Sequence, residues 1–104
     1  MSEGEWHRVA NTADVAPDEP IKVRVGEVEV ALYNVDGAIF ATDNICTHAY
    51  ASLADGYQDG EEIECPLHEG RFNIKTGEAL CPPCDTDLKV FDVKVEGDAV
   101  FVKV

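Results

Sequence analysis

The sequence predicts an all-β fold: an antiparallel β-sandwich with an inserted two-loop subdomain. Both ends of the 104-residue chain contain segments in which apolar and polar residues alternate, as they do in half-buried strands. The middle, approximately residues 43–87, lacks this period and is rich in Gly, Pro, Asp and Asn. Since a chain of this length fits one domain, we expect a single domain, 1–104, with the subdomain between two halves of the sandwich.

The N-terminal half predicts three strands in a row. Residues 21–25 alternate as Ile-Lys-Val-Arg-Val, and residues 28–35 are rich in β-formers. Asp36-Gly37 then precedes residues 38–42, and Asp-Gly between two apolar runs favours a tight hairpin turn. We therefore expect neighbouring antiparallel strands here.

The C-terminal end predicts a second hairpin, and the middle only short strands. Residues 89–95 read Lys-Val-Phe-Asp-Val-Lys-Val, Glu96-Gly97-Asp98 predicts a turn, and residues 100–104 alternate again. Within the subdomain, residues 61–64 and 71–74 are the candidate strands.

Charge and hydropathy limit the possible partners. Lys and Arg number 8 and Asp and Glu 21, giving a formal net charge of −13, which disfavours binding to nucleic acid or anionic lipid. The acidity speeds encounter with a basic protein partner or only maintains solubility, and both interpretations stay open. The longest apolar stretches, such as 30–33 and 38–41, are far below the ~20 residues that span a bilayer. With no export signal visible, we expect a soluble cytoplasmic protein that does not enter a membrane.

Two short motifs, Cys46-Thr47-His48 and Cys65-Pro66-Leu67-His68, carry the chemistry. Each pairs a soft thiolate with a neutral imidazole, and residues 49–64 separate them. Two Cys on one iron and two His on the other form the ligand set of a Rieske [2Fe-2S] centre, which accepts one electron. The predicted ligands of one cluster per chain are Cys46, His48, Cys65 and His68.

Residues downstream extend this pattern: Gly70, Phe72, Thr76-Gly77 and Pro82-Pro83 complete the signature C-x-H, C-P-x-H-x-G-x-F, T-G and a proline loop. The chain thus resembles Rieske-type ferredoxins, specifically the ferredoxin component of bacterial aromatic-ring-hydroxylating dioxygenase systems. The resemblance implies a Rieske-type sandwich that carries electrons from a flavoprotein ferredoxin reductase to the terminal oxygenase and is not itself an enzyme. It also implies that the two Cys bind an inner iron and the two His an outer iron near the surface.

Departures from the respiratory Rieske pattern predict a low reduction potential. High-potential members carry a disulfide between the ligand loops, where this chain has Ala51 and Leu67. They also donate hydrogen bonds to the cluster from a Ser and a Tyr, where this chain has Gly70 and Phe72. We therefore expect a value toward the lower end of the Rieske range, about −150 to +300 mV.

Three alternatives remain for the same residues. Two Cys and two His also complete a structural zinc site, although the downstream signature has no role in one. A Rieske-like nitrite reductase subunit without a cluster would not need all four ligands. An electron carrier for a different Rieske-type monooxygenase would keep the same chemistry.

Residues outside the ligand set receive simpler interpretations. We favour Cys81-Pro82-Pro83-Cys84 as a proline loop with two non-ligand thiols over a redox dithiol, and leave their pairing open. Trp6 is expected in the core, and the four Phe in the core or shielding the cluster. The run Asp55, Asp59, Glu61, Glu62 and Glu64 is either a solvated face or a docking surface, and Tyr50 and Tyr57 either pack or lie near a partner.

Overall fold

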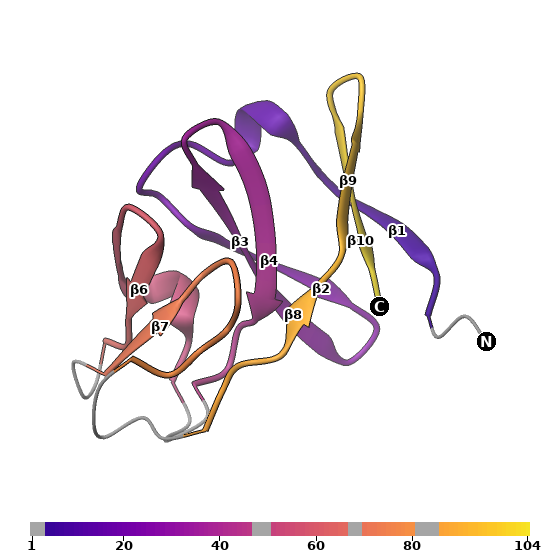
Figure 1. Ribbon diagram of the computed structural model, residues 1–104. Coiled ribbons are helices and arrows are strands. Elements are labelled where there is room, and N and C mark those ends of the chain that lie inside the picture. The colour runs from indigo at the N-terminus through magenta and orange to yellow at the C-terminus, as the bar shows by residue number, and fades with distance from the viewer. Residues whose placement is uncertain (1–3, 47–50, 67–69, 81–85) are drawn as a thin grey trace.

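The computed structural model describes residues 4–46, 51–66, 70–80 and 86–104. These residues form three antiparallel sheets, with the strand orders β1-β10-β9, β2-β3-β4-β8 and β5-β6-β7. The small sheet β5-β6-β7 and the sheet β1-β10-β9 lie on opposite sides of the molecule, with β3 and β4 between them (Figure 1). The prediction of an all-β antiparallel fold is confirmed.

The central sheet is built from the predicted N-terminal strands. Its members are β2 (Ile21–Val25), β3 (Val28–Val35), β4 (Ala38–Asp43) and β8 (Val90–Phe91). Between β3 and β4, Asp36 and Gly37 have φ values of 54° and 91°, as the predicted tight hairpin turn requires. The Asn34 side chain accepts a hydrogen bond from the Gly37 amide and so closes this turn.

The second sheet contains a strand that the sequence pattern did not predict. It consists of β1 (Trp6–Asn11), β9 (Val93–Glu96) and β10 (Ala99–Lys103), with β10 in the middle. Trp6 faces outward and is 40% exposed, so the prediction that it lies in the core is wrong. Its ring instead packs under the Lys94 ammonium, 4.7 Å from the ring centroid.

The predicted single strand at 89–95 is also wrong, because the chain changes sheets within it. β8 pairs with β4 in the central sheet, whereas β9 pairs with β10 in the second sheet. Asp92 lies at the break, and its carbonyl accepts a hydrogen bond from the Lys103 amide. A strand that crosses from one sheet to the other makes a corner of a β-sandwich.

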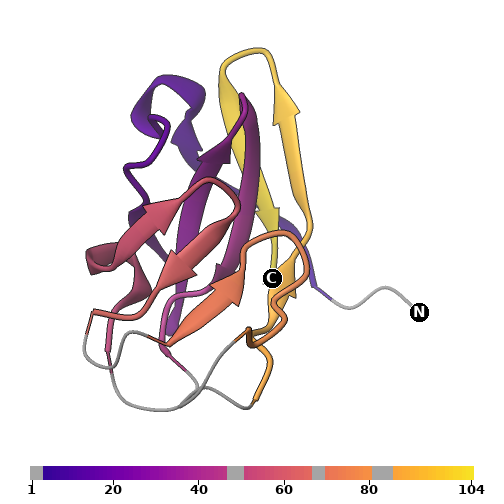
Figure 2. The same cartoon turned by 60° about the vertical axis from the view of Figure 1, so that its left-hand side comes forward.

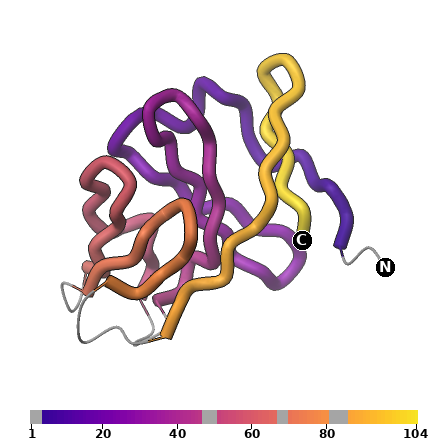
Figure 3. Tube along the Cα trace, in the orientation of Figure 1, coloured from indigo at the N-terminus to yellow at the C-terminus, as the bar shows by residue number. Residues whose placement is uncertain are grey.

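The core of the sandwich lies between these two sheets. Its members are buried apolar side chains from both sheets and from the segment before β2: Val15, Val30, Leu32, Ala41, Phe91, Val100 and Val102. The first described residues lie beside the C-terminal strand (Figure 3), and Glu5 and Val104 exchange two backbone hydrogen bonds of 2.9 and 3.1 Å.

The inserted subdomain contains the third sheet: β5 (Tyr57–Asp59), β6 (Glu62–Glu64) and β7 (Arg71–Asn73). β6 and β7 lie within the predicted segments, whereas β5 was not predicted. Gln58 of β5 joins the subdomain to the sandwich, since its amide donates to the Asn34 carbonyl at 2.9 Å. Two short 3₁₀ helices, η1 (Thr12–Asp14) and η2 (Leu53–Asp55), complete the described elements, and neither is long or apolar enough to cross a bilayer.

Candidate metal centre

The first ligand loop, residues 46–51, begins shortly after β4, which ends at Asp43. Ile45 and Ser52 form an isolated antiparallel bridge at its base. Inside this bridge the Cys46 amide donates a hydrogen bond of 3.0 Å to the Ala51 carbonyl. Cys46 is therefore held by backbone pairing at the start of the loop, independently of its side chain.

The second ligand loop, residues 65–70, connects β6 to β7 and is closed in the same way. Glu64 and Arg71 are strand partners at its base, and the Cys65 amide donates a hydrogen bond of 2.8 Å to the Gly70 carbonyl. Each cysteine is thus the first residue of a loop whose closing bond joins residues i and i+5. The described residues on either side of both loops lie at the same end of the molecule (Figure 2).

Both thiols lie in one apolar core. Cys46 is 4% exposed and Cys65 is 1% exposed. This core, which we call the subdomain core, also contains side chains from β3, η2, β6, β7 and the flanking segments: Ala31, Tyr33, Val35, Ala51, Leu53, Ile63, Phe72, Ile74 and Leu88. Two buried soft donors, brought together from two equivalent loops, fit a thiolate-bound metal cluster.

The described part of the predicted ligand set consists of the two cysteines. His48 and His68, like Tyr50, Leu67 and the segment Cys81–Cys84, lie outside the described residues. Within the described ranges, no group of three or more His, Cys, Asp and Glu side chains is arranged to hold a metal ion. The two cysteines are therefore the part of the predicted ligand set whose surroundings the structure describes.

Asn44 anchors the first ligand loop and was missed by sequence reasoning. Its side chain is fully buried and donates to the Ser52 hydroxyl at 2.9 Å and to the Glu29 carboxylate at 3.2 Å. Its side-chain oxygen accepts from the Ala54 amide at 2.9 Å, and its backbone carbonyl accepts from the Leu53 amide at 2.7 Å. One residue thus fixes both ends of the loop.

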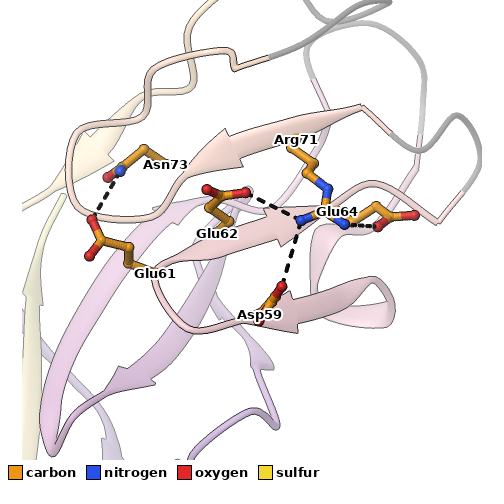
Figure 4. Close-up of polar contacts among 6 residues, drawn as sticks. All are labelled: Asp59, Glu61, Glu62, Glu64, Arg71 and Asn73. Carbon is orange, nitrogen blue, oxygen red and sulfur yellow. Dashed lines mark hydrogen bonds and ion pairs between the residues drawn. The ribbon is translucent and has the colours of Figure 1, made fainter.

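Arg71 anchors the second ligand loop by charge (Figure 4). Its guanidinium lies 3.0 Å from Glu64, 3.3 Å from Glu62 and 3.8 Å from Asp59. The hydrogen bond to Glu62 raises the pKa of Arg71 most, desolvation works against it, and the charges of Glu64, Glu62 and Asp59 add to the rise. Part of the predicted acidic run therefore serves an intramolecular ion network, while Glu61 accepts a hydrogen bond from Asn73.

Gly77, in the predicted Thr-Gly motif, joins the subdomain to the segment before β8. It has a φ of 80°, its amide donates to the Asn73 carbonyl at 2.7 Å, and its carbonyl accepts from the Leu88 amide at 2.7 Å. A side chain at this position would collide with the Leu88 backbone. The glycine is required by this close approach.

The aromatic residues divide between core and surface. Phe72 is fully buried in the subdomain core with both cysteines, as expected for a shielding residue, and Phe91 is buried in the sandwich core. Phe40 packs against the subdomain core and is partly exposed. Phe101 is also partly exposed, so its predicted place in the core is only half correct. Tyr57 is 69% exposed. It is the strand partner of Glu64, the residue before the second ligand loop.

Comparison with known proteins shows the family of this chain. The family model described as "Rieske [2Fe-2S] domain" matches residues 5–92. A ferredoxin component of naphthalene 1,2-dioxygenase/salicylate 5-hydroxylase systems from Ralstonia sp. is 47% identical over 98 residues, covering 94% of each chain.

Solved structures show the same fold. The Sphingomonas yanoikuyae B1 ferredoxin superposes with a TM-score of 0.92 at 44% identity, over 96% of this chain and 99% of that one. A chain in a complex of reduced oxygenase and oxidized ferredoxin in carbazole 1,9a-dioxygenase gives 0.90 at 40% identity, over 97% and 94%. The predicted family and fold are confirmed, and the chain belongs to the family of Rieske [2Fe-2S] domains.

Proposed function

We propose that this protein is a one-electron carrier in which Cys46, His48, Cys65 and His68 hold one [2Fe-2S] cluster per chain. The observation that carries the proposal is the matched closure of the two ligand loops, which brings both buried thiols into one apolar core. When bound, such a cluster supplies reversible one-electron chemistry, with unequal ligands on its two irons.

The chain's own residues hold and shield the site. Cys46 and Cys65 present their sulfurs from positions whose backbone amides are paired with the Ala51 and Gly70 carbonyls. Phe72 and Leu53, both fully buried, exclude water from the thiol side. The side chains of Gly70 and Phe72 carry no hydroxyl that could donate to the cluster, which supports the expectation of a low potential.

The proposed partners are a flavoprotein ferredoxin reductase, which would supply the electron, and the terminal oxygenase of an aromatic-ring-hydroxylating dioxygenase, which would receive it. Support comes from similar proteins that are named ferredoxin components of dioxygenase systems, and from the similar ferredoxin solved in complex with its oxygenase. We propose that the transfer takes place in the cytoplasm.

A second candidate is an electron carrier for a different Rieske-type hydroxylase. The Ralstonia relative is named for a salicylate 5-hydroxylase system as well as for naphthalene 1,2-dioxygenase. One carrier of this type is therefore associated with two oxygenase activities.

The test is reconstitution with purified holoprotein. We expect iron and acid-labile sulfide in equal amounts at two each per chain, and a low-average-g electron paramagnetic resonance spectrum after dithionite reduction. A candidate reductase and terminal oxygenase should form product only when this protein is added. Parallel assays with a dioxygenase and a hydroxylase distinguish the two candidates.

Ligand variants provide the matched control. C46S and C65S should lose the cluster, whereas C81S, at a cysteine outside the proposed ligand set, should retain it. A colourless protein with one zinc per chain, or a cluster that survives C46S, would contradict the proposal.

A further inference from the structure

The base of the second ligand loop holds an arginine that the proposed ligand set does not use. We infer that Arg71 is a positioning residue: its guanidinium fixes the strand ends from which Cys65 projects and, through its charge, favours the reduced state of the centre. This inference rests on the proposed function and adds a residue to it.

The position of Arg71 in the sheet carries the first step. Arg71 is the strand partner of Glu64, and partners in antiparallel strands have Cα atoms about 5 Å apart. Glu64 immediately precedes Cys65, and Arg71 immediately follows Gly70, whose carbonyl accepts the Cys65 amide. The ion pair between Glu64 and Arg71 therefore spans the residues next to the closing hydrogen bond of the loop.

The ion network connects all three strands of the small sheet. Arg71 is on β7, Glu62 and Glu64 are on β6, and Asp59 is on β5 (Figure 4). The Glu64 contact is the shortest, at 3.0 Å, and its side chain is 24% exposed, so solvent screens it least. Asp59, at 3.8 Å and 71% exposed, contributes least. The guanidinium geometry suits simultaneous contact with Glu62 and Glu64, which a Lys ammonium reproduces less well.

The same contacts give the site an unbalanced charge. Three carboxylates surround one cation, so removal of the guanidinium leaves Asp59, Glu62 and Glu64 facing one another with nothing to offset them. An electron added to the cluster makes the centre more negative, and nearby carboxylates oppose that change. Arg71 acts against them from the strand position opposite Glu64, the residue that immediately precedes Cys65.

The first ligand loop shows that loop closure does not require this charge. There the corresponding anchor is Asn44, a neutral and fully buried side chain that forms hydrogen bonds at both ends of the loop. Two loops with identical backbone closure therefore have different anchors. The charged anchor at the second loop has an effect on electron affinity that the neutral anchor lacks.

The experiment measures the reduction potential and the rate of cluster loss of the purified holoprotein, without any partner protein. R71Q removes both the charge and the guanidinium geometry, and R71K retains the charge alone. E62Q removes one carboxylate and leaves the ion pair between Glu64 and Arg71 in place. K94Q is the matched control, because it makes the same change in net charge on β9, in the sheet on the far side of the sandwich. Neither measurement depends on product formation, so failure of the inference about Arg71 is distinguishable from failure of the proposed function.

We expect R71Q to lower the potential and to shorten the half-life of the cluster, and K94Q to change neither. R71K should keep the wild-type potential and show an intermediate half-life, and E62Q should raise the potential. Added salt should reduce each shift in potential. A wild-type potential in R71Q, or equal shifts in R71Q and R71K, would overturn the inference. If R71Q does not fold with a cluster, E62Q and R71K decide: an unchanged potential in E62Q also overturns it.

Discussion

Replacement of Gly77 by alanine should destabilise the holoprotein more than the same change at a turn glycine with open space around it, such as Gly97. Gly77 has a φ of 80°, where an L-residue with a side chain is strained. A Cβ here would also overlap the Leu88 carbonyl oxygen and would lie 2.8 Å from Cγ2 of Val90. The added Cβ has no room between the Leu88 backbone and the Val90 side chain. The segment before β8 must therefore move away from the subdomain.

The magnitude follows from two separable costs. The left-handed conformation costs a side chain roughly 1–2 kcal/mol, and overpacking adds about 1–3 kcal/mol. Gly97→Ala isolates the first cost, since Gly97 has a φ of 60° and nothing lies within 4 Å of its added Cβ. Because 1 kcal/mol shifts the melting temperature of a domain of this size by about 4–8 °C, G97A should lose about 4–16 °C, and G77A should lose clearly more because it carries both costs.

The assay is thermal unfolding of the holoprotein, followed by circular dichroism and by visible absorbance at one fixed scan rate. A fixed rate is needed because cluster loss makes unfolding irreversible. In G77A, absorbance should be lost together with or before the β signal, because the displaced segment packs against the subdomain core through Leu88. Equal melting temperatures in G77A and G97A would refute the reasoning, since the collision would then have no energetic consequence.

Three further predictions concern buried residues. Burial raises the pKa of Tyr33 far above its ordinary value, so above pH 10 this phenol ionises only in the unfolded chain and the wild type should lose stability. Y33F should abolish this decline in urea unfolding and should cost about 1 kcal/mol at neutral pH, because the hydrogen bond to Thr42 is lost. Y57F, at an exposed side chain, should do neither. N44A should cost about 2–4 kcal/mol and accelerate cluster loss, measured by visible absorbance, because the Ala54 amide and the Ser52 hydroxyl lose their partner at the first ligand loop. An unchanged rate would show that the loop closes without this anchor. F72Y should raise the potential by about 60 mV if its hydroxyl stabilises the reduced state by about 1.4 kcal/mol, and potentiometry giving the wild-type value would exclude such a contact.

Local sequence patterns predicted the hairpins well, because each depends on neighbouring residues. Asp36-Gly37 adopts the left-handed conformations of a tight turn, and residues 28–35 form β3 with the predicted bounds. The failures involve partners distant in sequence. β1 exists because Trp6–Asn11 pairs with β10, at the other end of the chain, and its residues show no clean alternation by themselves. The break at Asp92 is likewise set by two different sheets competing for neighbouring residues.

The same distinction applies to the metal site. Cys46 and Cys65 were identified because the chemistry of their motifs is specific, and both are buried in the subdomain core. Asn44 and Arg71 were missed, since their roles depend on strand register and on contacts with Ser52 and Glu64. Asn44 precedes the first motif by two residues and Arg71 follows Gly70 directly, so a polar residue flanking a ligand loop is the only available signal. Such a signal does not indicate which partner the side chain will find.

The distribution of the cysteines between the two cores predicts how the protein responds to loss of metal. The subdomain core contains both thiols, whereas the sandwich core contains neither. β3 contributes to both, with Tyr33 on one face and Leu32 on the other, so the sandwich can retain its packing when the opposite face loosens. After removal of iron by a chelator, amide hydrogen exchange should accelerate in β5, β6 and β7 and remain slow in β2, β3 and β10. Uniform loss of protection would instead show that the cluster stabilises the sandwich and the subdomain as one cooperative unit.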